Sequence, residues 1–572
     1  MPGPFRALAV DYDGTLTQRG PPSASLLTAL ARARSGGLRL VLVTGRILAE
    51  LRAEFPDVAE HFDGIVAENG AVLALPGQPS RALAPPISGE LAAALVARGV
   101  PVARGEVLLA TDARHDAAVL AEITRLGLEC HLVRNRAALM ILPPGTSKGA
   151  GLVAALAELG LSHHDTIGVG DAENDHSLLD ACEIGVAVGN AIDALKRHAD
   201  VVLDAPAGAG VEALLASPLL DGRARVSPRR WQVTLGTGSK GPVRLPGTPG
   251  HVLVTGGPGT GKSHLAGLLA ERWLELGYSV CVIDPEGDHV ALGQLREVVV
   301  LGGRDALPAP GHLAHLFRHG VGGVVLDLSL VDRETRRRHG RDALRELQAL
   351  QRDTGRPHWI VVDEAHVFMP RHEGACTLVH PGLCLVTYRP DLLCRTQVSA
   401  LDTVLVAAGG AAAGTVSPAP FLAANTLGAW VCPEEALPPE HALLLRRPPE
   451  VSTSFRPAER RSQHVRHWHK YAEGQVAPHL RFAFRTAHGL TGHHAGNLIE
   501  LHRELELCPT AVLEHHRRTH DIARWLRDVL GDVTLARDVL TLDTSGAPDE
   551  ALRGALLIAI ERRYLADGGP LA

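Results

Sequence analysis

The chain has 572 residues, of which 45% are hydrophobic and 21% are charged. This composition is typical of globular proteins and excludes a predominantly disordered chain. At roughly 150 residues per domain, the length favours about three or four domains. The formal net charge of −6 is slight for this length, so it neither requires nor excludes a nucleic-acid partner.

The cysteines and the N-terminal segment favour a cytoplasmic protein. The 8 Cys are scattered and form no CxxC pair, which indicates free thiols in a reducing compartment. Residues 7–10 form an apolar strand-like run with no signal-peptide pattern before it. Residues 404–414 are uncharged and rich in Ala and Gly, but this segment is shorter than the roughly 20 apolar residues that a membrane helix needs. We therefore expect no membrane partner.

The N-terminal third predicts an α/β domain with an insert. Apolar strand-like runs, such as residues 39–43 and 166–170, alternate with helical patterns. Short strands that are apolar on both faces and separated by helices indicate a parallel sheet covered on both sides. Residues 74–143 instead show a helix–strands–helix–strands pattern. We expect an α/β core formed by residues 1–73 and 144–220, with a small α+β domain inserted between them.

The remaining chain divides at changes of composition. Residues 221–250 are rich in Pro and Gly and predict a linker with a hairpin, and a second βαβ series covers residues 251–445. Residues 446–463 are polar, basic and contain Pro, which predicts a linker. Residues 464–572 repeat apolar side chains at helical spacing and predict a helical C-terminal domain.

Two carboxylates, Asp11 and Asp13, follow the first apolar strand. Because open α/β sheets bind ligands at the carboxyl ends of their strands, both side chains are expected in one crevice. Such a pair divides the chemistry, since one carboxylate attacks while the other transfers a proton. Taken alone, the pair is about as well explained as a turn before Gly14.

Three further elements point to phosphate chemistry. Thr44 ends a second apolar strand, and Lys148 opens a helix, where its charge and free backbone N–H groups suit a phosphate. Asp171 and Asp175 follow a third apolar strand and offer hard oxygen ligands for Mg²⁺. Each element alone reads as a turn or a cap, but the four in this order favour a phosphatase over four unrelated turns.

This order resembles the haloacid dehalogenase superfamily of phosphatases. The resemblance implies that Asp11 attacks phosphorus and becomes an aspartyl-phosphate, while Asp13 protonates the leaving alcohol and then activates water. It also implies that Thr44 and Lys148 hold the phosphoryl oxygens. Asp11, Asp171 and the backbone carbonyl of Asp13 are the implied Mg²⁺ ligands, supported by Asp175.

The position of the insert resembles a C2-type cap, and residues 67–71 resemble the Cof-like, class IIB branch. That branch acts mostly on sugar phosphates, phosphoglycolate and similar small phosphomonoesters, so a small phosphorylated substrate is the expected partner. Arg46, Asn69 and Asn174 are candidate substrate contacts. Asn69 precedes Gly70 and is equally well explained as a turn residue.

A P-loop occupies residues 256–263, which match GxxxxGK[ST] between an apolar strand and a helix. Backbone N–H groups of such a loop turn towards phosphates, Lys262 reaches the β and γ phosphates of ATP, and Ser263 binds Mg²⁺. The candidate nucleotide-binding residues are Gly256, Gly259, Thr260, Gly261, Lys262, Ser263 and Asp363.

The partner of the P-loop follows the apolar residues 359–362. Asp363 is expected to hold Mg²⁺ through water and Glu364 to orient the attacking water. Residues 284–288 and 387–390 resemble the HerA/FtsK class of RecA-like motor ATPases. The chain departs from that class because Tyr388 replaces its usual Gln and because the N-terminal barrel of HerA translocases is absent.

The HerA/FtsK resemblance implies a homo-oligomer whose sites lie between subunits, with Arg389 the nearest candidate arginine for the transition state. The arginines of residues 446–461 could supply such a residue from a neighbour, but a soluble linker is the favoured interpretation. Those of residues 333–345 alternate with acids and predict a solvated helix face rather than a DNA track. His516 and His520 stand at a zinc-like spacing, but no third ligand is near in sequence, so packing is favoured.

Three functions are therefore weighed. The favoured one is a Mg²⁺-dependent small-molecule phosphatase fused to an ATPase, with Mg²⁺ and ATP as cofactors. The second is a nucleic-acid-associated HerA-like motor with an accessory phosphatase. The third is a phosphatase that is gated by a bound nucleotide.

Overall fold

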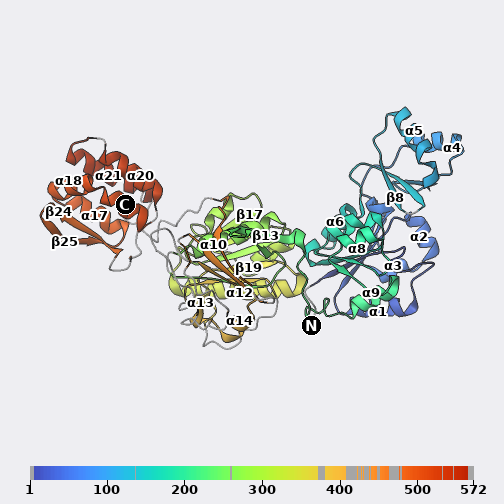
Figure 1. Ribbon diagram of the computed structural model, residues 1–572, viewed down its shortest axis with the longest axis horizontal. Coiled ribbons are helices and arrows are strands. Elements are labelled where there is room, and N and C mark those ends of the chain that lie inside the picture. The colour runs from blue at the N-terminus through green and yellow to red at the C-terminus, as the bar shows by residue number, and fades with distance from the viewer. Residues whose placement is uncertain are drawn as a thin grey trace.

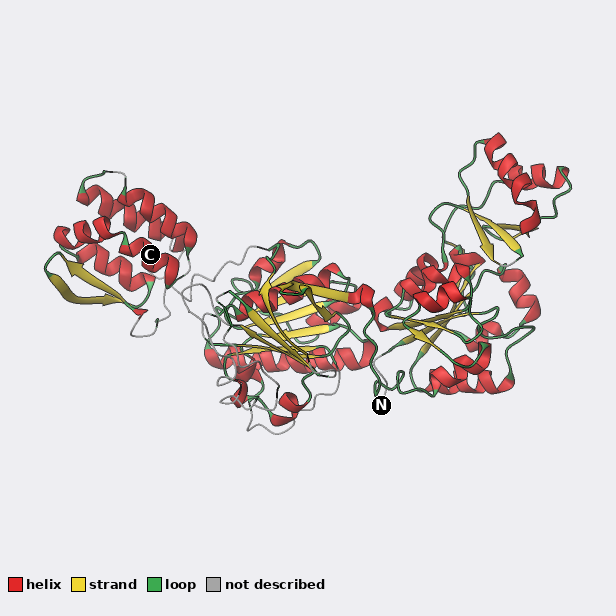
Figure 2. Cartoon of the chain, in the orientation of Figure 1, coloured by secondary structure: helices red, strands yellow, loops and turns green. Residues whose placement is uncertain are grey.

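The computed structural model shows an α/β domain with an insert, a second α/β domain and a small helical domain along the chain (Figure 1). It describes residues 5–564 except positions 136, 258–259, 371–380, 408–421, 423–426, 428–429, 431–436, 439, 448–450, 463–475, 477–479, 531 and 545. These residues form four sheets. Figure 2 shows helices on both sides of the two large sheets.

The N-terminal domain is built on an eight-stranded sheet of order β12-β11-β10-β1-β2-β3-β4-β5. Neighbours from β12 to β3 pair in parallel, and β4 and β5 add an antiparallel edge. The strands are β1 (Ala7–Asp11), β2 (Arg39–Val43), β3 (Gly64–Ala67), β4 (Val72–Ala74), β5 (Arg81–Ala82), β10 (Thr166–Gly170), β11 (Ile184–Ala187) and β12 (Val201–Val202).

Helices cover both faces of this sheet, as the apolar strands require. Figure 1 shows α6 and α8 above the sheet and α1 and α9 below it. The Ser147 hydroxyl accepts the Ala150 N–H at 3.2 Å, which caps α6 and starts that helix at Lys148. The helices are α1 (Ala24–Ser35), α2 (Leu48–Glu54), α3 (Val58–His61), α6 (Lys148–Glu158), α7 (His176–Asp180), α8 (Asp193–His198) and α9 (Ala207–Leu215).

The inserted domain has its own four-stranded antiparallel sheet of order β6-β7-β9-β8. Its core contains Leu91, Leu95, Val119 and Ile141, which pack between the sheet and two helices. Its elements are α4 (Gly89–Ala97), β6 (Ala103–Arg104), β7 (Leu109–Asp112), α5 (Asp116–Leu126), β8 (His131–Asn135) and β9 (Ala138–Leu142). The α+β insert predicted from the sequence corresponds to this unit.

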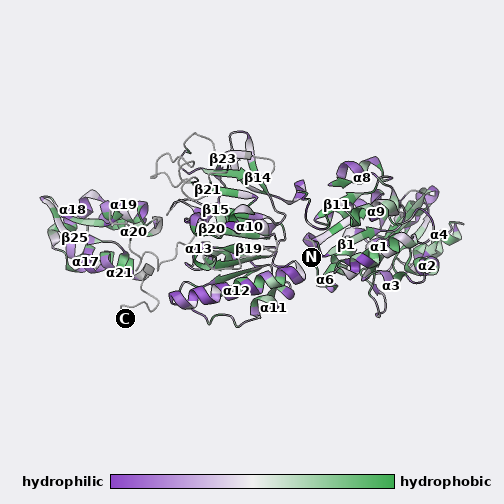
Figure 3. Cartoon of the chain, turned by 90° about the horizontal axis from the view of Figure 1, so that it is seen from below, coloured by the Kyte–Doolittle hydropathy of each residue, from purple (hydrophilic) through white to green (hydrophobic). Residues whose placement is uncertain are grey.

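The P-loop domain is built on an eleven-stranded sheet of order β14-β13-β23-β22-β21-β15-β20-β19-β16-β18-β17. The run from β21 to β17 is parallel, and Figure 3 shows its apolar strands between more polar helices. These strands are β15 (His251–Thr255), β16 (Val280–Asp284), β17 (Val298–Gly302), β18 (Gly323–Asp327), β19 (Trp359–Val362), β20 (Leu383–Thr387) and β21 (Thr403–Ala407). The helices include α10 (Lys262–Glu275), α11 (His312–Arg318), α12 (Arg333–Thr354), α13 (Ala365–Phe368) and α14 (Arg395–Ser399).

Two segments expected to be linkers instead extend this sheet. The 221–250 segment carries β13 (Gln232–Gly238) and β14 (Gly241–Pro246), and the 446–463 segment carries β23 (Val451–Pro457). β23 pairs with both β13 and β22 (Ala442–Arg446), all antiparallel. The apolar side chains Val233, Leu235 and Phe455 are buried in the domain core, which is why these polar-looking segments fold as strands.

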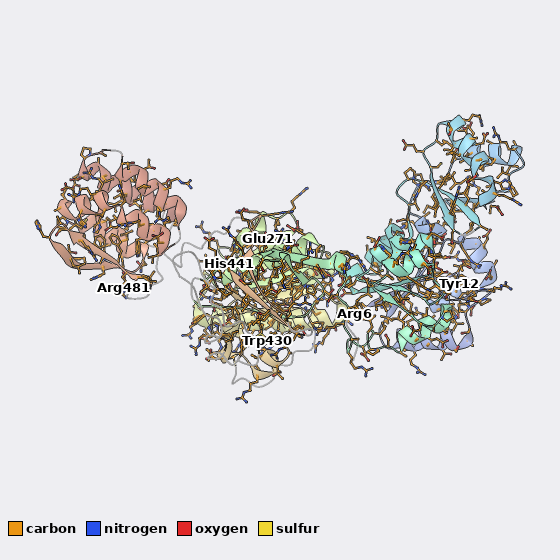
Figure 4. All side chains as sticks on the ribbon, viewed as in Figure 1. Arg6, Tyr12, Glu271, Trp430, His441 and Arg481 are labelled. Carbon is orange, nitrogen blue, oxygen red and sulfur yellow. The ribbon has the colours of Figure 1, made fainter. Side chains whose placement is uncertain are left out.

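A buried junction joins the two α/β domains (Figure 4 labels Arg6 beside it). On the N-terminal side it uses residues that precede β1, β10 and β11, and on the P-loop side residues that precede β16 and β19. The contacts are Arg6 Nη2 to Gln351 O at 3.1 Å, His164 Nε2 to Leu276 O at 2.9 Å, Tyr278 Oη to Glu183 Oε2 at 2.9 Å and His358 Nε2 to Ser162 Oγ at 3.0 Å.

The junction therefore places the two sheets back to back. Because the parallel strands of both domains begin at the junction, their carboxyl ends point away from it and from each other. In Figure 1 the inserted domain accordingly lies on the side of the N-terminal domain that faces away from the P-loop domain. Ligand sites at the carboxyl ends of the two sheets must open towards opposite ends of this pair.

In the described part of the C-terminal domain, five helices pack against a hairpin. His516 is buried and bonds to the Asp521 carboxylate at 2.7 Å, whereas His520 bonds to Asp543 at 3.0 Å, so the two rings do not converge on one point. Its elements are β24 (Phe482–Thr486), β25 (Gly489–Ala495), α17 (Leu498–Leu507), α18 (Thr510–Thr519), α19 (Asp521–Asp528), α20 (Val533–Asp543) and α21 (Asp549–Tyr564). No helix in the described part of the chain is long and apolar enough to cross a membrane.

Candidate functional site

One ammonium and three carboxylates are buried together at the carboxyl ends of β1 and β10. Lys148 Nζ lies 2.6 Å from Asp11 Oδ1 and 2.6 Å from Asp175 Oδ1. Oxygens of Asp11, Asp171 and Asp175 all lie within 4.8 Å of one another. The four side chains come from three separate segments, which the parallel sheet and the start of α6 bring to one place.

The charges in this cluster do not balance. Burial raises the pKa of Asp11 well above its ordinary value, the charge of Asp175 raises it further, and Lys148 opposes both effects. Burial lowers the pKa of Lys148, but Asp11 and Asp175 outweigh burial and raise it. Three carboxyl groups share a single ammonium, so the donor set fits a divalent cation that prefers oxygen ligands, such as Mg²⁺.

Backbone contacts hold the cluster in place. One oxygen of Asp175 accepts the N–H groups of Asp171 at 2.8 Å and Ala172 at 2.9 Å, while its other oxygen faces Lys148. The Thr15 hydroxyl donates to Asp171 Oδ1 at 3.3 Å. These contacts hold Asp175 in a fixed position beside Lys148; its supporting role at the metal stays a prediction.

Asp13 lies at the edge of the cluster and is partly exposed. Arg46 donates to both of its oxygens, at 2.8 Å from Nε and 2.6 Å from Nη2, and also pairs with Glu54. The hydrogen bonds to Asp13 raise the pKa of Arg46 above its ordinary value. Arg46, a predicted substrate contact, thus also orients the carboxylate that is expected to transfer a proton.

A cavity of about 330 Å³ opens above this cluster between the core and the inserted domain. Asn135 from the inserted domain lines it, and its Oδ1 is buried without a hydrogen-bond partner. The sequence analysis missed Asn135, because nothing in the sequence indicates which face of β8 meets the core. The lining residues are Asp11, Asp13, Gly45, Arg46, Ile47, Glu50, Ala110, Asn135, Ala138 and Met140.

Three other predicted residues, Thr44, Asn69 and Asn174, are not among those that line the cavity in this structure. Thr44 is fully buried, and its hydroxyl accepts the Arg46 N–H at 3.1 Å. Asn69 and Asn174 are buried and bond to each other, Nδ2 of Asn174 donating to Oδ1 of Asn69 at 3.1 Å. Neither lines the cavity. In this structure the pair therefore joins the loop after β10 to the turn after β3.

The P-loop follows β15, and Lys262 is the first residue of α10. Gly256 and Gly261 have φ values of 145° and 98°, which only glycine adopts readily. Lys262 Nζ donates to the Gly257 carbonyl at 2.9 Å, and Ser263 Oγ donates to Asp288 Oδ2 at 2.9 Å. The candidate residue Gly259 lies outside the described residues, and Thr260 Oγ1 bonds to the Gly257 carbonyl at 2.9 Å.

The loop after β16 brings two further residues to the P-loop site. Asp284 accepts four backbone N–H groups of this loop, the shortest from Gly287 at 2.7 Å, and burial raises its pKa to about 7. This turn places Asp288 against Ser263 and His289 Nε2 at 3.1 Å from Asp363 Oδ2. His289 had no signal in the sequence, because its position beside Asp363 depends on this turn.

Glu364 and His366 lie beside Asp363. Glu364 has a φ of 44°, and its carboxylate lies 3.4 Å from the His366 ring. The same ring bonds to Thr387 Oγ1 at 2.9 Å and contacts Tyr388, whose ring centre is 5.8 Å from Lys262 Nζ. An aromatic ring and an imidazole thus lie beside Lys262 and Thr387 at the P-loop site.

The arginines of the 446–463 segment were expected in a soluble linker, but one of them, Arg460, is buried. Arg460 is 2% exposed at its side chain and pairs at 3.1 Å with the buried Glu271 of α10. Figure 4 labels Glu271. Glu271 also accepts the backbone N–H groups of Arg461 and Ser462. Residues 460–462 are therefore bound to α10, the helix that follows the P-loop, through Glu271. Arg389 is exposed and makes two hydrogen bonds of 2.9 Å to Asp391.

Helix α12 carries the arginine-rich face that the sequence predicts to be solvated, and Figure 3 shows the helix as largely hydrophilic. A groove of about 430 Å³ runs along it, lined by Glu334, Arg337, Arg338, Arg341, Asp342 and Arg345. Arg345 pairs with Asp342 at 3.0 Å. The mixture of signs agrees with the predicted solvated face.

Comparison with known proteins finds two family matches. Residues 8–85 and 107–215 match the family of haloacid dehalogenase-like hydrolases. Residues 245–332 match the central domain of the helicase HerA.

Individual relatives match the N-terminal part. The phosphoglycolate phosphatase of Methanothermobacter thermautotrophicus is 31% identical over 216 residues, which is 36% of this chain and 96% of that protein. The phosphoglycolate phosphatase of Archaeoglobus fulgidus is 31% identical over 215 residues, or 36% and 93% of the two chains. A solved structure of a haloacid dehalogenase-like hydrolase from Bacteroides thetaiotaomicron is 21% identical, covers 37% of this chain and 98% of its own, and has a TM-score of 0.33.

The charge imbalance predicts that Mg²⁺ stabilises the folded chain. A ligand present at 100 times its dissociation constant stabilises the folded state by about 2.7 kcal/mol, so Mg²⁺ is expected to raise the melting temperature measured by calorimetry without nucleotide. Asp171→Asn removes one of the three carboxylates and is expected to lose most of this shift. The exposed Asp221→Asn is the matched control, and an undiminished shift in Asp171→Asn would contradict the metal site.

Proposed function

Because the N-terminal part of this chain belongs to the haloacid dehalogenase-like hydrolases and makes it a phosphatase, we propose that it is a Mg²⁺-dependent phosphomonoesterase joined to an ATP-hydrolysing P-loop domain. The observation that carries this proposal is the buried cluster of Asp11, Lys148, Asp171 and Asp175 at the base of a cavity. That cluster combines a nucleophile, a cation for phosphate oxygens and a set of metal ligands.

The residues act on the substrate in a defined order. Asp11 attacks phosphorus and carries the phosphoryl group as an aspartyl-phosphate, and Asp13 gives its proton to the leaving alcohol and later takes one from water. Thr44 and Lys148 hold the phosphoryl oxygens as charge develops on them. Asp11, Asp171 and the Asp13 carbonyl would hold Mg²⁺, which would supply positive charge that offsets repulsion between a carboxylate and a phosphate.

The cavity supports a small substrate. Its volume of about 330 Å³ lies at the lower end of the roughly 300–1,000 Å³ typical of ligand pockets. Arg46 and Asn135 offer polar contacts beside Asp13, while Ala110 and Ala138 leave room between them. A short phosphorylated acid or sugar fits this lining, in agreement with the relatives that are phosphoglycolate phosphatases.

The P-loop domain is proposed to bind ATP with Mg²⁺ and to hydrolyse it, with Lys262 on the phosphates, Ser263 and Asp363 at the metal, and Glu364 on the attacking water. We propose that it works as an oligomer, because Arg389 and Arg460 are engaged by Asp391 and Glu271 and a neighbouring subunit can supply the transition-state arginine. The match to HerA supports this arrangement.

A nucleotide-gated phosphatase is the second candidate, and one contact favours it. The P-loop helix α10 runs from Lys262 to the junction, where the Leu276 carbonyl bonds to His164 of the N-terminal domain. A movement of α10 on nucleotide binding would reach the phosphatase through this contact.

The acid role of Asp13 predicts a dependence on the leaving group. General acid catalysis contributes about 10²–10⁴-fold, so Asp13→Asn is expected to slow hydrolysis of alkyl phosphates about 100-fold or more. An activated aryl phosphate, whose leaving group scarcely needs a proton, should lose less than about tenfold. Steady-state rates on both substrate types decide this, with the exposed Asp57→Asn as control, and equal losses would exclude the acid role.

The role of Glu364 predicts a variant that binds ATP without hydrolysing it. Glu364→Gln is expected to lower the ATPase rate about 100-fold or more, because the attacking water is no longer oriented. Phosphatase turnover of the same preparation separates the two candidates: it is unchanged by saturating ATP if the active sites are independent and altered if nucleotide gates the phosphatase. The exposed Glu297→Gln should keep both activities, and full ATPase activity in Glu364→Gln would refute its assignment.

A further inference from the structure

The turn that follows β3 has an unusual backbone. Glu68, Asn69 and Gly70 have consecutive positive φ values of 52°, 56° and 103°. Positive φ is unfavourable for residues other than glycine, and such conformations persist only where surrounding contacts determine them. The contacts that this turn makes therefore explain why its unfavourable backbone conformation is kept.

The Glu68 carboxylate reaches from the core into the inserted domain. Its side chain is fully buried, and its two oxygens accept three backbone N–H groups from the turn between β6 and β7. The donors are Glu106 at 2.8 Å, Val107 at 2.8 Å and Leu108 at 3.0 Å. Such charge-assisted bonds are stronger than those between neutral groups.

Gly105 makes this close approach feasible. A Cβ atom built on Gly105 would lie 2.4 Å from the Glu68 carboxylate oxygen Oε1, closer than any two such atoms can stand. The Glu68 side chain and the glycine at position 105 therefore both favour this contact. We call the Glu68 carboxylate together with residues 105–108 the Glu68 latch.

The other two residues of the turn contact the catalytic loops. Asn69 bonds to Asn174 in the loop that carries Asp171 and Asp175. Gly70 lies against Ser147, since a Cβ there would come within 1.9 Å of the Ser147 carbonyl, directly before Lys148. One strained turn therefore contacts the inserted domain and two of the three segments that form the charged cluster, the start of α6 and the loop after β10.

We propose that Glu68 is a positioning residue that fixes the inserted domain over the phosphatase cavity. β7 begins directly after the latch and carries Ala110 into the cavity wall, and Asn135 and Met140 follow on the strands beside it. The latch therefore sets the distance between these strands of the inserted domain and Asp11. This inference rests on the proposed phosphatase function for its kinetic consequence, but the latch itself is measurable without any substrate.

Glu68→Gln tests the latch while preserving side-chain size. The amide keeps one acceptor oxygen and turns an NH₂ group towards backbone N–H donors, so amide hydrogen exchange at residues 106–108 is expected to accelerate about tenfold or more. For p-nitrophenyl phosphate, the KM is expected to rise about tenfold while kcat changes less than about threefold, because the charged cluster stays intact. The exposed Glu129→Gln in the same inserted domain should leave exchange and kinetics unchanged.

A second variant approaches the contact from the other side. Gly105→Ala keeps Glu68 but forces its carboxylate away, so it should reproduce both effects, and it carries the test alone if Glu68→Gln does not fold. Unchanged exchange and KM in the folded variants would overturn the latch. If exchange accelerates but native protein hydrolyses no phosphomonoester, the latch stands and the proposed phosphatase function fails; accelerated exchange with an unchanged KM would overturn its role in positioning the cavity wall.

Discussion

An excess of buried negative charge is the constraint on which the N-terminal domain depends. Asp11, Asp171 and Asp175 are held within a few ångströms of each other against a single ammonium, Lys148, and burying such a set is costly unless it is paired and hydrogen-bonded. The structure meets that cost by fixing Asp175 with backbone N–H groups and by starting α6 at Lys148. The remaining imbalance suits a dication and a phosphate, so the same charges that are costly to bury supply the chemistry.

The back-to-back junction decides how two such sites share one chain. Because the strands of both sheets begin at the junction, the phosphate cavity and the P-loop open in opposite directions, and no product passes directly between them. At the junction, His164 bonds to both Glu183 and the Leu276 carbonyl at the end of α10, which offers a route for coupling between the domains. A segment that follows β23 is anchored on the same helix through Glu271, so α10 contacts the P-loop, the phosphatase domain and this segment.

The sequence predicted the two α/β domains and the insert because strand-end motifs and alternating apolar runs are local signals. It also placed Asp11 and Asp13 in one crevice, since open α/β sheets bind ligands at the carboxyl ends of their strands. The resemblance to haloacid dehalogenase phosphatases implied that Lys148, Asp171 and Asp175 join them there. It could not show that Asn69 and Asn174 bond to each other, or that Asn135 lines the cavity, because these facts depend on how the inserted domain packs. The charged and proline-rich composition of residues 446–463 predicts a linker, although this segment contains β23 and Arg460. Its few apolar residues give only a weak local signal, because they become buried only against residues that are distant in the sequence.

The central claim is that Asp11 is the nucleophile of a phosphatase that operates separately from the P-loop site. The most direct measurement is phosphomonoester and ATP hydrolysis by one purified preparation of Asp11→Asn, with Mg²⁺, beside the native chain. Phosphate release from the phosphomonoester is expected to fall to background while the ATPase rate is retained. Phosphatase turnover close to that of the native chain would contradict it.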